Sequence, residues 1–328
     1  MMNGCICCTV RGDLVEALKN LYTKIEQFDA VIIETTGLAD PAPVAQTFFI
    51  DEDIREKYSL DGIVTVVDAR HIIDRLDDEK PEGVENEAVE QVAFADRILL
   101  NKIDLLRNDD AKLTAIEKRI HSINSGVQII RTQQSVIDPK SIINLNMFSL
   151  DRVLEFDPEF LSGDEEHEHD PTISSVSCKF EGFLNQAQLN NWISTILQQL
   201  GADLFRYKGL LSVAGNNKKF IFQGVGMLFS GGFSDESWKE DETRECRFVF
   251  IGKNLPREEL KDGFMACKCE EQLRFKKGDK VQADVGEWLK GKVIGTWDDG
   301  NPYRIELEDG SNTNVWGPID TDEYVKAV

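Results

Sequence analysis

Residues 97–104 of this chain are Arg97-Ile98-Leu99-Leu100-Asn101-Lys102-Ile103-Asp104. A short apolar run that ends in polar side chains is typical of a strand buried on both faces of a parallel sheet. The same pattern occurs at 30–33, 62–67 and 127–130, and stretches with helical spacing of apolar residues separate these runs. Strands that alternate with helices in this way predict a doubly wound α/β domain.

The four residues Asn101-Lys102-Ile103-Asp104 suit a guanine-binding loop. A carboxylate at Asp104 can accept hydrogen bonds from guanine N1–H and N2–H₂, a pair of donors that adenine lacks. The stem of Lys102 can lie over the base, and Asn101 can either reach guanine N7 or tether neighbouring loops. A strand end followed by a helix-capping aspartate gives the same four residues, so both interpretations stay open.

A second polar cluster, Glu34-Thr35-Thr36-Gly37, follows the apolar run at 30–33. An acidic side chain at that strand end can hold Mg²⁺ through water, and a glycine lets a backbone N–H approach a terminal phosphate closely. An ordinary turn between a strand and a helix is the alternative. Ligands of open α/β sheets bind at the carboxyl ends of the strands, where this cluster, Asp68 and residues 101–104 are all expected.

Two groups of residues are candidates for metal binding. The thiols of Cys5, Cys7 and Cys8 lie within four positions, and thiolates favour Zn²⁺ or Cu(I) over Mg²⁺. A buried or redox-active cysteine cluster would look the same. His167 and His169 alternate with carboxylates in the acidic run 164–170, which suits either a weak metal site or a solvated linker.

Composition limits the classes of protein to which the chain can belong. The net charge of −22 would repel a phosphate backbone, which argues against a nucleic-acid-binding function. No run of eighteen apolar residues predicts a membrane span, and the first residues do not resemble a signal peptide. Seven cysteines without a disulfide-type spacing favour a reducing compartment, so we expect a cytoplasmic location, with an upstream organelle-targeting segment left open.

The second half of the chain has a different organisation. Residues 172–270 alternate strand and helix patterns in the manner of an α+β domain, and 274–328 carry short strands with tight turns that predict a small all-β barrel. Aromatic side chains in such a barrel can form a wall that binds a peptide, or they can be core. The residues concerned are Trp288, Trp297, Tyr303 and Trp316.

Taken in order, several segments closely resemble the CobW-like P-loop GTPases, a family that includes zinc-regulated metallochaperones. The segments are 3–11, 33–41, 61–68, 96–104, 205–209 and 248–255. The resemblance implies that GTP binding and hydrolysis, with Mg²⁺, are coupled to binding of Zn²⁺ or another transition metal and to its delivery to a client protein. Residues 274–328 lie outside that architecture and resemble SH3-like or Tudor-like barrels, for which a peptide ligand is expected.

The resemblance also implies roles for individual residues. Glu34 and Gly37 match the turn at Mg²⁺ and the γ-phosphate, and Asn101, Lys102 and Asp104 match the guanine site. The cysteines of the CxCC segment match the family's metal ligands, and a His-rich stretch between domains is common in the family. The implied metal ligands are therefore Cys5, Cys7, Cys8, His167 and His169.

The chain departs from the family in one respect, because its 328 residues contain no GxxGxGK[ST] loop. That loop supplies a backbone N–H cradle, a phosphate-binding lysine and a Mg²⁺-binding hydroxyl. We therefore expect an incomplete GTPase domain at 1–150, a linker at 151–171, the CobW C-terminal domain at 172–270 and the barrel at 274–328. We also expect impaired nucleotide binding and no GTP hydrolysis by these residues. A non-enzymatic metal-binding adaptor with a peptide-binding barrel is the alternative function.

Overall fold

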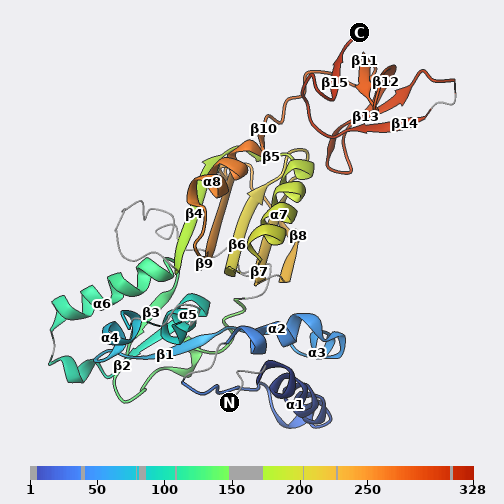
Figure 1. Ribbon diagram of the computed structural model, residues 1–328. Coiled ribbons are helices and arrows are strands. Elements are labelled where there is room, and N and C mark those ends of the chain that lie inside the picture. The colour runs from blue at the N-terminus through green and yellow to red at the C-terminus, as the bar shows by residue number, and fades with distance from the viewer. Residues whose placement is uncertain are drawn as a thin grey trace.

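The computed structural model is elongated, with three regions that follow one another from the N-terminus to the C-terminus (Figure 1). It describes residues 6–37, 41–78, 80, 86–107, 109–147, 173–201, 203–226, 228–310 and 313–328, with the backbone alone at 6–11. The predicted linker at 151–171 lies outside these residues. Within the described parts, no helix combines the length and apolar character needed to cross a bilayer.

The first region contains a parallel sheet, which confirms the predicted α/β class. Its strands are β1 (Val64–Asp68), β2 (Arg97–Asn101) and β3 (Gln128–Arg131), in the order β1-β2-β3. Three helices, α4 (Ile72–Leu76), α5 (Glu87–Phe94) and α6 (Asp110–Ile123), connect them. The apolar runs predicted at 62–67, 97–100 and 127–130 are therefore strands to within two residues.

Helix α6 shows why the local pattern was sufficient. Its four apolar residues at helical spacing are all buried in the core of this region, and the carboxylate of Asp109 caps its start by accepting the Lys112 N–H at 3.0 Å. Burying such side chains contributes about 1.5–3 kcal/mol each. The four residues are Leu113, Ile116, Ile120 and Ile123.

The strand predicted at 30–33 is wrong, because residues 30–36 are irregular and Ile32 is 80% exposed. A strand needs a neighbour to pair its N–H and C=O groups. Among the described residues β1 pairs with β2 alone, so it is an edge strand, and its Val66 is 60% exposed. The apolar run at 30–33 has no partner in this structure and does not extend the sheet.

The apolar spacing within 12–27 predicts a helix with Asp13 as its cap. The observed helix begins earlier, as α1 (Ile6–Tyr22), and a 3-10 turn follows at Ile25–Gln27. Asp13 lies inside α1 and does not cap its start, contrary to the prediction. Helices α2 (Ala42–Ile50) and α3 (Glu52–Lys57) pack against α1. Their shared core is formed by Leu18, Phe48 and Ile54.

The second region is an α+β domain, as predicted. Its five-stranded antiparallel sheet has the order β4-β9-β6-β7-β8, and α7 (Gln186–Leu200) and α8 (Arg257–Ala266) lie beside it in Figure 1. The strands are β4 (Ile173–Glu181), β6 (Leu204–Ser212), β7 (Lys218–Val225), β8 (Leu228–Ser237) and β9 (Glu245–Lys253). A small ladder joins β5 (Phe183–Leu184) to β10 (Lys268–Cys269).

The third region is a five-stranded antiparallel sheet in the order β14-β13-β12-β11-β15, which confirms the all-β prediction. Its strands are β11 (Lys280–Asp284), β12 (Trp288–Asp298), β13 (Asn301–Leu307), β14 (Asn314–Gly317) and β15 (Val325–Ala327). Asp299 and Gly300 turn the chain between β12 and β13 with φ of 51° and 75°, the left-handed backbone that a tight hairpin requires.

The four aromatic residues of this region do not form one wall. Tyr303 is 0% exposed and belongs to the core, and Trp297 donates its Nε1–H to the Glu271 carbonyl at 3.0 Å. The exposed rings of Trp288 and Trp316 are each covered by a cation: Lys326 Nζ lies 3.7 Å and Arg304 Cζ 5.2 Å from the respective ring centroid. Of the two alternatives that the sequence left open, Tyr303 follows the core alternative.

Candidate functional site

The carboxyl ends of β1 and β2 bring two of the predicted polar clusters together. Asp68 and Asn101 are paired in the parallel register, and Ala69 N–H donates to the Asn101 carbonyl at 2.9 Å. Because β1 and β2 are short and in register, the residues that follow them emerge at the same edge of the sheet. We call Asp68 and residues 101–104 the nucleotide edge.

Asn101 acts as a tether between the loops that follow β2 and β3. Its Oδ1 accepts the Thr132 hydroxyl at 3.1 Å and the Ser135 N–H at 3.0 Å, and its Nδ2 donates to Ser135 Oγ at 2.8 Å. The side chain is buried. Of the two roles that the sequence left open, the structure shows the tether, which fixes the loop that carries Lys102 and Asp104.

Lys102 turns the chain out of the sheet and pairs with Asp68. Its φ of 62° is left-handed, and the 3-10 helix Ile103–Leu106 begins directly after it. Its Nζ lies 2.8 Å from Asp68 Oδ2. In this arrangement the lysine links the loop after β2 to the end of β1.

Asp68 is strongly acidic at this edge. Burial acts to raise its pKa, but three hydrogen bonds outweigh burial and lower the pKa to about 2. The donors are Lys102 Nζ, His71 Nδ1 at 3.1 Å and the Arg70 N–H at 2.9 Å. The position of Asp68 after an apolar run pointed to this edge, whereas nothing in the sequence pointed to His71 or Ser135.

The Asp104 carboxylate faces solvent. It is exposed, and among the described residues no donor reaches it, although its backbone carbonyl accepts the Arg107 N–H at 3.2 Å. A carboxylate that has no protein partner in this structure can accept two hydrogen bonds from a base. The guanine-binding role of Asp104 stays a prediction, and the exposed carboxylate leaves room for it.

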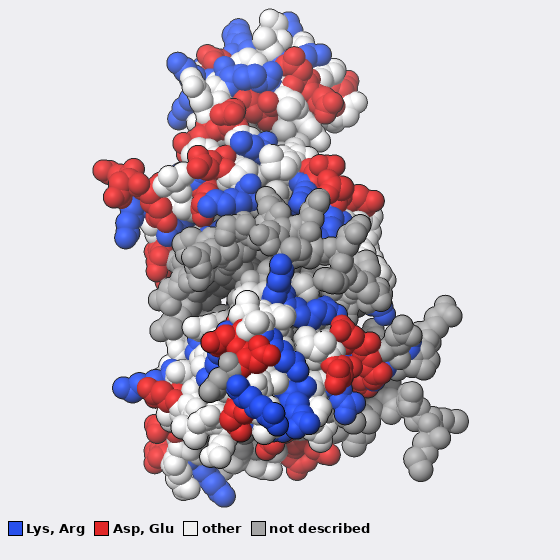
Figure 2. Space-filling model, turned by 90° about the vertical axis from the view of Figure 1, so that its left-hand side faces the viewer, with Lys and Arg blue, Asp and Glu red and all other residues white. Residues whose placement is uncertain are grey.

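Positive charge gathers on the side of the first region where α6 lies. Figure 2 views the molecule from that side, and blue side chains cluster over the lower part of the view. Lys102, Arg107 and Arg131 are exposed at or near the ends of β2 and β3. Two of these cations are paired within the protein, Lys102 with Asp68 and Arg131 with Glu117, so the local positive charge is partly neutralised.

Glu34 and Gly37 form no hydrogen bond with the guanine residues among the described parts of the chain. Both are exposed on the irregular segment, and Gln91 Nε2 of α5 donates to the Gly37 carbonyl at 3.2 Å. Among the described residues, no hydrogen bond or ion pair joins residues 34–37 to residues 101–104. Their predicted role at Mg²⁺ and the γ-phosphate stays a prediction.

The predicted metal ligands are only partly within the structure. Cys7 and Cys8 lie in the first turn of α1, where the backbone alone is described, and Cys5, His167 and His169 lie outside the described residues. Figure 1 places α1 beside α2 and α3, away from α6. Where side chains are described, no three His, Cys, Asp or Glu residues form a metal-binding group. The CxCC site therefore stays a prediction.

Three cysteines of the second region, Cys246, Cys267 and Cys269, have a structural character. Cys246 and Cys267 are buried, and burial raises the pKa of both thiols and of Cys269 to about 12. The Cys246 thiol lies 3.4 Å from the Ser212 carbonyl, and the Cys267 thiol 3.3 Å from the Gly263 carbonyl. Such thiols stay protonated at neutral pH and are poor metal ligands.

Two family models match the chain in order. Residues 1–131 match the CobW/HypB/UreG nucleotide-binding domain, and residues 173–268 match the cobalamin synthesis protein cobW C-terminal domain. The zinc chaperone YjiA of Escherichia coli is 33% identical over 270 residues, which is 80% of this chain and 80% of that protein. The zinc-regulated GTPase metalloprotein activator 1 of Schizosaccharomyces pombe is 33% identical over 291 residues, covering 78% and 68% of the two chains.

A solved structure of Zn(II)-bound YjiA GTPase from Escherichia coli superimposes on this chain with a TM-score of 0.65 at 31% identity, covering 78% of this chain and 76% of the other. The resemblance in sequence, the order of the two matched domains and the superposition agree with one another. The chain belongs to the CobW family of GTPases.

Proposed function

We propose that this protein is a GTP-dependent metallochaperone, which binds zinc or another transition metal and delivers it to a client protein. The observation that carries the proposal is the nucleotide edge: Asn101 holds a loop on which Asp104 presents an unpaired carboxylate. The names of the relatives, zinc chaperones and zinc-regulated GTPases, support the choice of metal and of reaction. Cysteine usage supports a reducing location such as the cytoplasm.

Each ligand has its proposed residues. Asp104 would bind the guanine N1–H and N2–H₂, with Lys102 against the base. Glu34 and Gly37 would serve Mg²⁺ and the terminal phosphate. Zinc would be held by the thiolates of the CxCC segment, with the linker histidines as further ligands, and these residues are Cys5, Cys7, Cys8, His167 and His169.

Residues 1–328 by themselves would bind nucleotide weakly and would not hydrolyse GTP. Hydrolysis needs a phosphate cradle, a phosphate-binding lysine and a Mg²⁺-binding hydroxyl, which the family takes from a loop that this sequence does not contain. If these residues act without nucleotide, their function is that of a metal-binding adaptor, and the C-terminal sheet would supply a peptide-binding surface.

Guanine recognition can be tested at Asp104. In Asp104→Asn the amide can donate to the 2-oxo group of xanthine but loses one acceptor for guanine, so we expect GDP to bind about tenfold or more weakly and XDP more tightly. Fluorescent GDP and XDP titrations of residues 1–328 measure this. Asp109→Asn is the matched control, because Asp109 is exposed nearby and caps α6, a position where Asn serves equally well.

The outcomes of that titration separate the two functions. If Asp104→Asn binds GDP and XDP with the same affinities as the parent chain does, the guanine site is contradicted. An absence of GDP binding by every variant would favour the adaptor. Phosphate release from GTP above the buffer background would contradict the expectation that residues 1–328 are inactive.

Metal binding can be tested independently of nucleotide. We expect the double variant Cys7→Ser/Cys8→Ser to lose a high-affinity zinc site when zinc is titrated against a chromophoric chelator, because serine hydroxyls do not replace thiolates for a soft cation. Cys269→Ser is the control, since that thiol stays protonated in the fold. Unchanged stoichiometry and affinity in the double variant would remove the proposed CxCC site.

A further inference from the structure

Asp96 joins the amino ends of β1 and β2, at the opposite edge of the sheet from the nucleotide edge. It directly precedes β2, and its N–H donates to the Ile63 carbonyl at 2.8 Å. Its Oδ2 accepts the Ile63 N–H at 2.9 Å, so the same residue fixes the chain just before β1. Asp96 is 4% exposed, and a carboxylate this deeply buried needs charged or hydrogen-bonding partners.

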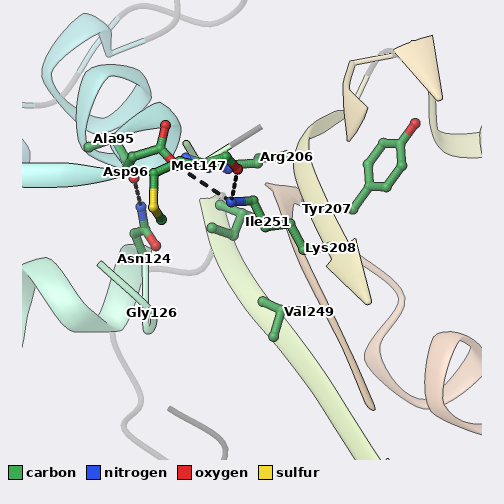
Figure 3. Close-up of a pocket in the computed structure, with 10 residues that line it drawn as sticks. All are labelled: Ala95, Asp96, Asn124, Gly126, Met147, Arg206, Tyr207, Lys208, Val249 and Ile251. Atoms are coloured by element: carbon green, nitrogen blue, oxygen red, sulfur yellow. Dashed lines mark hydrogen bonds and ion pairs between the residues drawn. The ribbon is translucent and has the colours of Figure 1, made fainter. Parts of the chain in front are cut away.

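The C-terminal domain supplies those partners from a single strand. Arg206 and Lys208 of β6 lie two residues apart and so project to the same side of the strand. Arg206 Nη2 forms an ion pair with Asp96 Oδ1, and Lys208 Nζ lies 3.5 Å from the same oxygen. Figure 3 shows the side chains of Asp96, Arg206 and Lys208 converging across the boundary between the two regions.

The same two side chains also contact further parts of the first region. Arg206 Nη1 donates to the Phe94 carbonyl at 3.0 Å, and Lys208 Nζ donates to the Met147 carbonyl at 2.8 Å. Met147 in turn donates its N–H to the Asp61 carbonyl at 2.8 Å. Through these contacts, β6 is bonded to the end of α5, to the residue before β2 and to the segment around Met147 at the end of the first region.

Apolar packing continues this contact. The ring of Phe205 stacks on Phe94 with centroids 5.5 Å apart, and a register shift in β6 between Leu204 and Arg206 lets neighbouring residues reach the first region. The core of that region includes Val249 and Ile251 of β9. Charges buried within such packing have few alternative partners, so their geometry defines how the two regions sit together.

We propose that Arg206 and Lys208 are positioning residues that couple the C-terminal domain to the nucleotide edge through Asp96 and strands β1 and β2. The proposal rests on the proposed guanine site at the carboxyl ends of these strands. Each strand has five residues and is therefore about 13 Å long, a distance over which a hydrogen-bonded strand is stiff. A shift of β6 at one end would move Asp68 and residues 101–104 at the other.

The coupling can be measured in the whole chain by hydrogen exchange, without nucleotide. We expect Lys208→Met and Arg206→Met to raise the exchange rates of amides in 64–68 and 97–104 about tenfold or more. Each substitution removes a contact with Asp96, and Asp96 fixes the amino ends of β1 and β2. Lys208→Met keeps the Arg206–Asp96 pair and should fold even if Arg206→Met does not. Arg206→Lys, which keeps a cation, should restore much of the protection.

Lys219→Met is the matched control. Lys219 is 8% exposed, as is Lys208, and it pairs with Glu242 at 2.8 Å inside the C-terminal domain. It should destabilise that domain and leave exchange in 97–104 unchanged. Unchanged exchange in 97–104 in Lys208→Met, or an equal rise in Lys219→Met, would overturn the coupling.

GDP titration of the same variants separates the coupling from the proposed function. If the parent chain binds GDP, Lys208→Met should bind it several-fold more weakly and Lys219→Met should bind it equally well. Equal GDP affinity in the parent and in Lys208→Met would also overturn the coupling. If the parent chain binds no GDP, the proposed function fails for residues 1–328, while hydrogen exchange still decides whether the coupling exists.

Discussion

Most polar side chains at the nucleotide edge form hydrogen bonds with one another or with residues of neighbouring loops. Asp68 accepts from Lys102 and His71, and Asn101 is occupied by Thr132 and Ser135. The carboxylate of Asp104 alone among these polar groups points away from the protein's own donors. The edge is therefore preorganised by the protein itself, which reduces the entropy lost when a ligand binds.

The charge of Asp68 can be detected through stability. Because its pKa is lowered to about 2 from 3.8, the unfolded chain binds the proton more tightly between pH 2 and 4. The carboxylate thus adds up to about 2 kcal/mol to the free energy of unfolding above pH 4, and this is lost as pH falls toward 2. Urea unfolding of the parent and of Asp68→Asn from pH 2.5 to 6 should show a gap that widens with pH. A gap independent of pH would show that the ion pair contributes nothing.

Helices and strands could be predicted from the sequence where residues within the element itself stabilise it. Helix α6 carries its own cap and apolar stripe, and β2 carries an apolar run that any parallel sheet buries. The run at 30–33 has the same composition but no strand beside it in the described parts. Its composition therefore predicted a strand that does not form. No clear strand pattern marks β8, because Gly231 and Gly232 interrupt it, or β15, because three residues are too few to show one.

The candidate site likewise contains residues that the sequence predicts and partners that it does not. The polar residues at the strand ends could be predicted, because a strand that ends in a polar side chain places it at the edge of the sheet. The partners of those residues could not, because Ser135 lies 34 residues from Asn101 and no local pattern links them. The contact of Asp96 with Arg206 spans 110 residues and was equally invisible in the sequence.

The end of α5 depends on one buried amide. Asn124 Nδ2 donates to the carbonyls of Val92, Ala93 and Ala95 at 3.0, 3.2 and 2.9 Å. Removing the side chain leaves these buried acceptors without that donor, so Asn124→Ala should lower the free energy of unfolding by about 1–3 kcal/mol. Urea denaturation measures it, with the exposed Asn190→Ala of α7 as control. Equal stability of the two variants would show that water replaces the amide.

At the scale of the whole molecule, the three regions are joined by contacts of different kinds. The first and second share a core and the buried charges around Asp96. The second and third meet at a smaller junction, where Asn185 Nδ2 donates to the Pro318 carbonyl at 2.8 Å. Trp297 lies against Gly215 at the same junction, and Gln186 lies against Gly300. Because this junction is formed by a few close contacts, a single substitution should be able to open it.

Gly215 is the position where such a substitution is most informative. Its φ is 75°, and a Cβ there would lie 2.4 Å from Trp297 Cβ, so Gly215→Val should displace the C-terminal sheet as well as strain the turn. Gly310→Val is the matched control, because its φ of 82° gives the same strain while a Cβ there meets nothing within 4 Å. We expect limited proteolysis within 270–279 to accelerate several-fold in Gly215→Val alone. Equal cleavage rates in both variants would mean that the third region is held by its linker and not by the contact of Trp297 with Gly215.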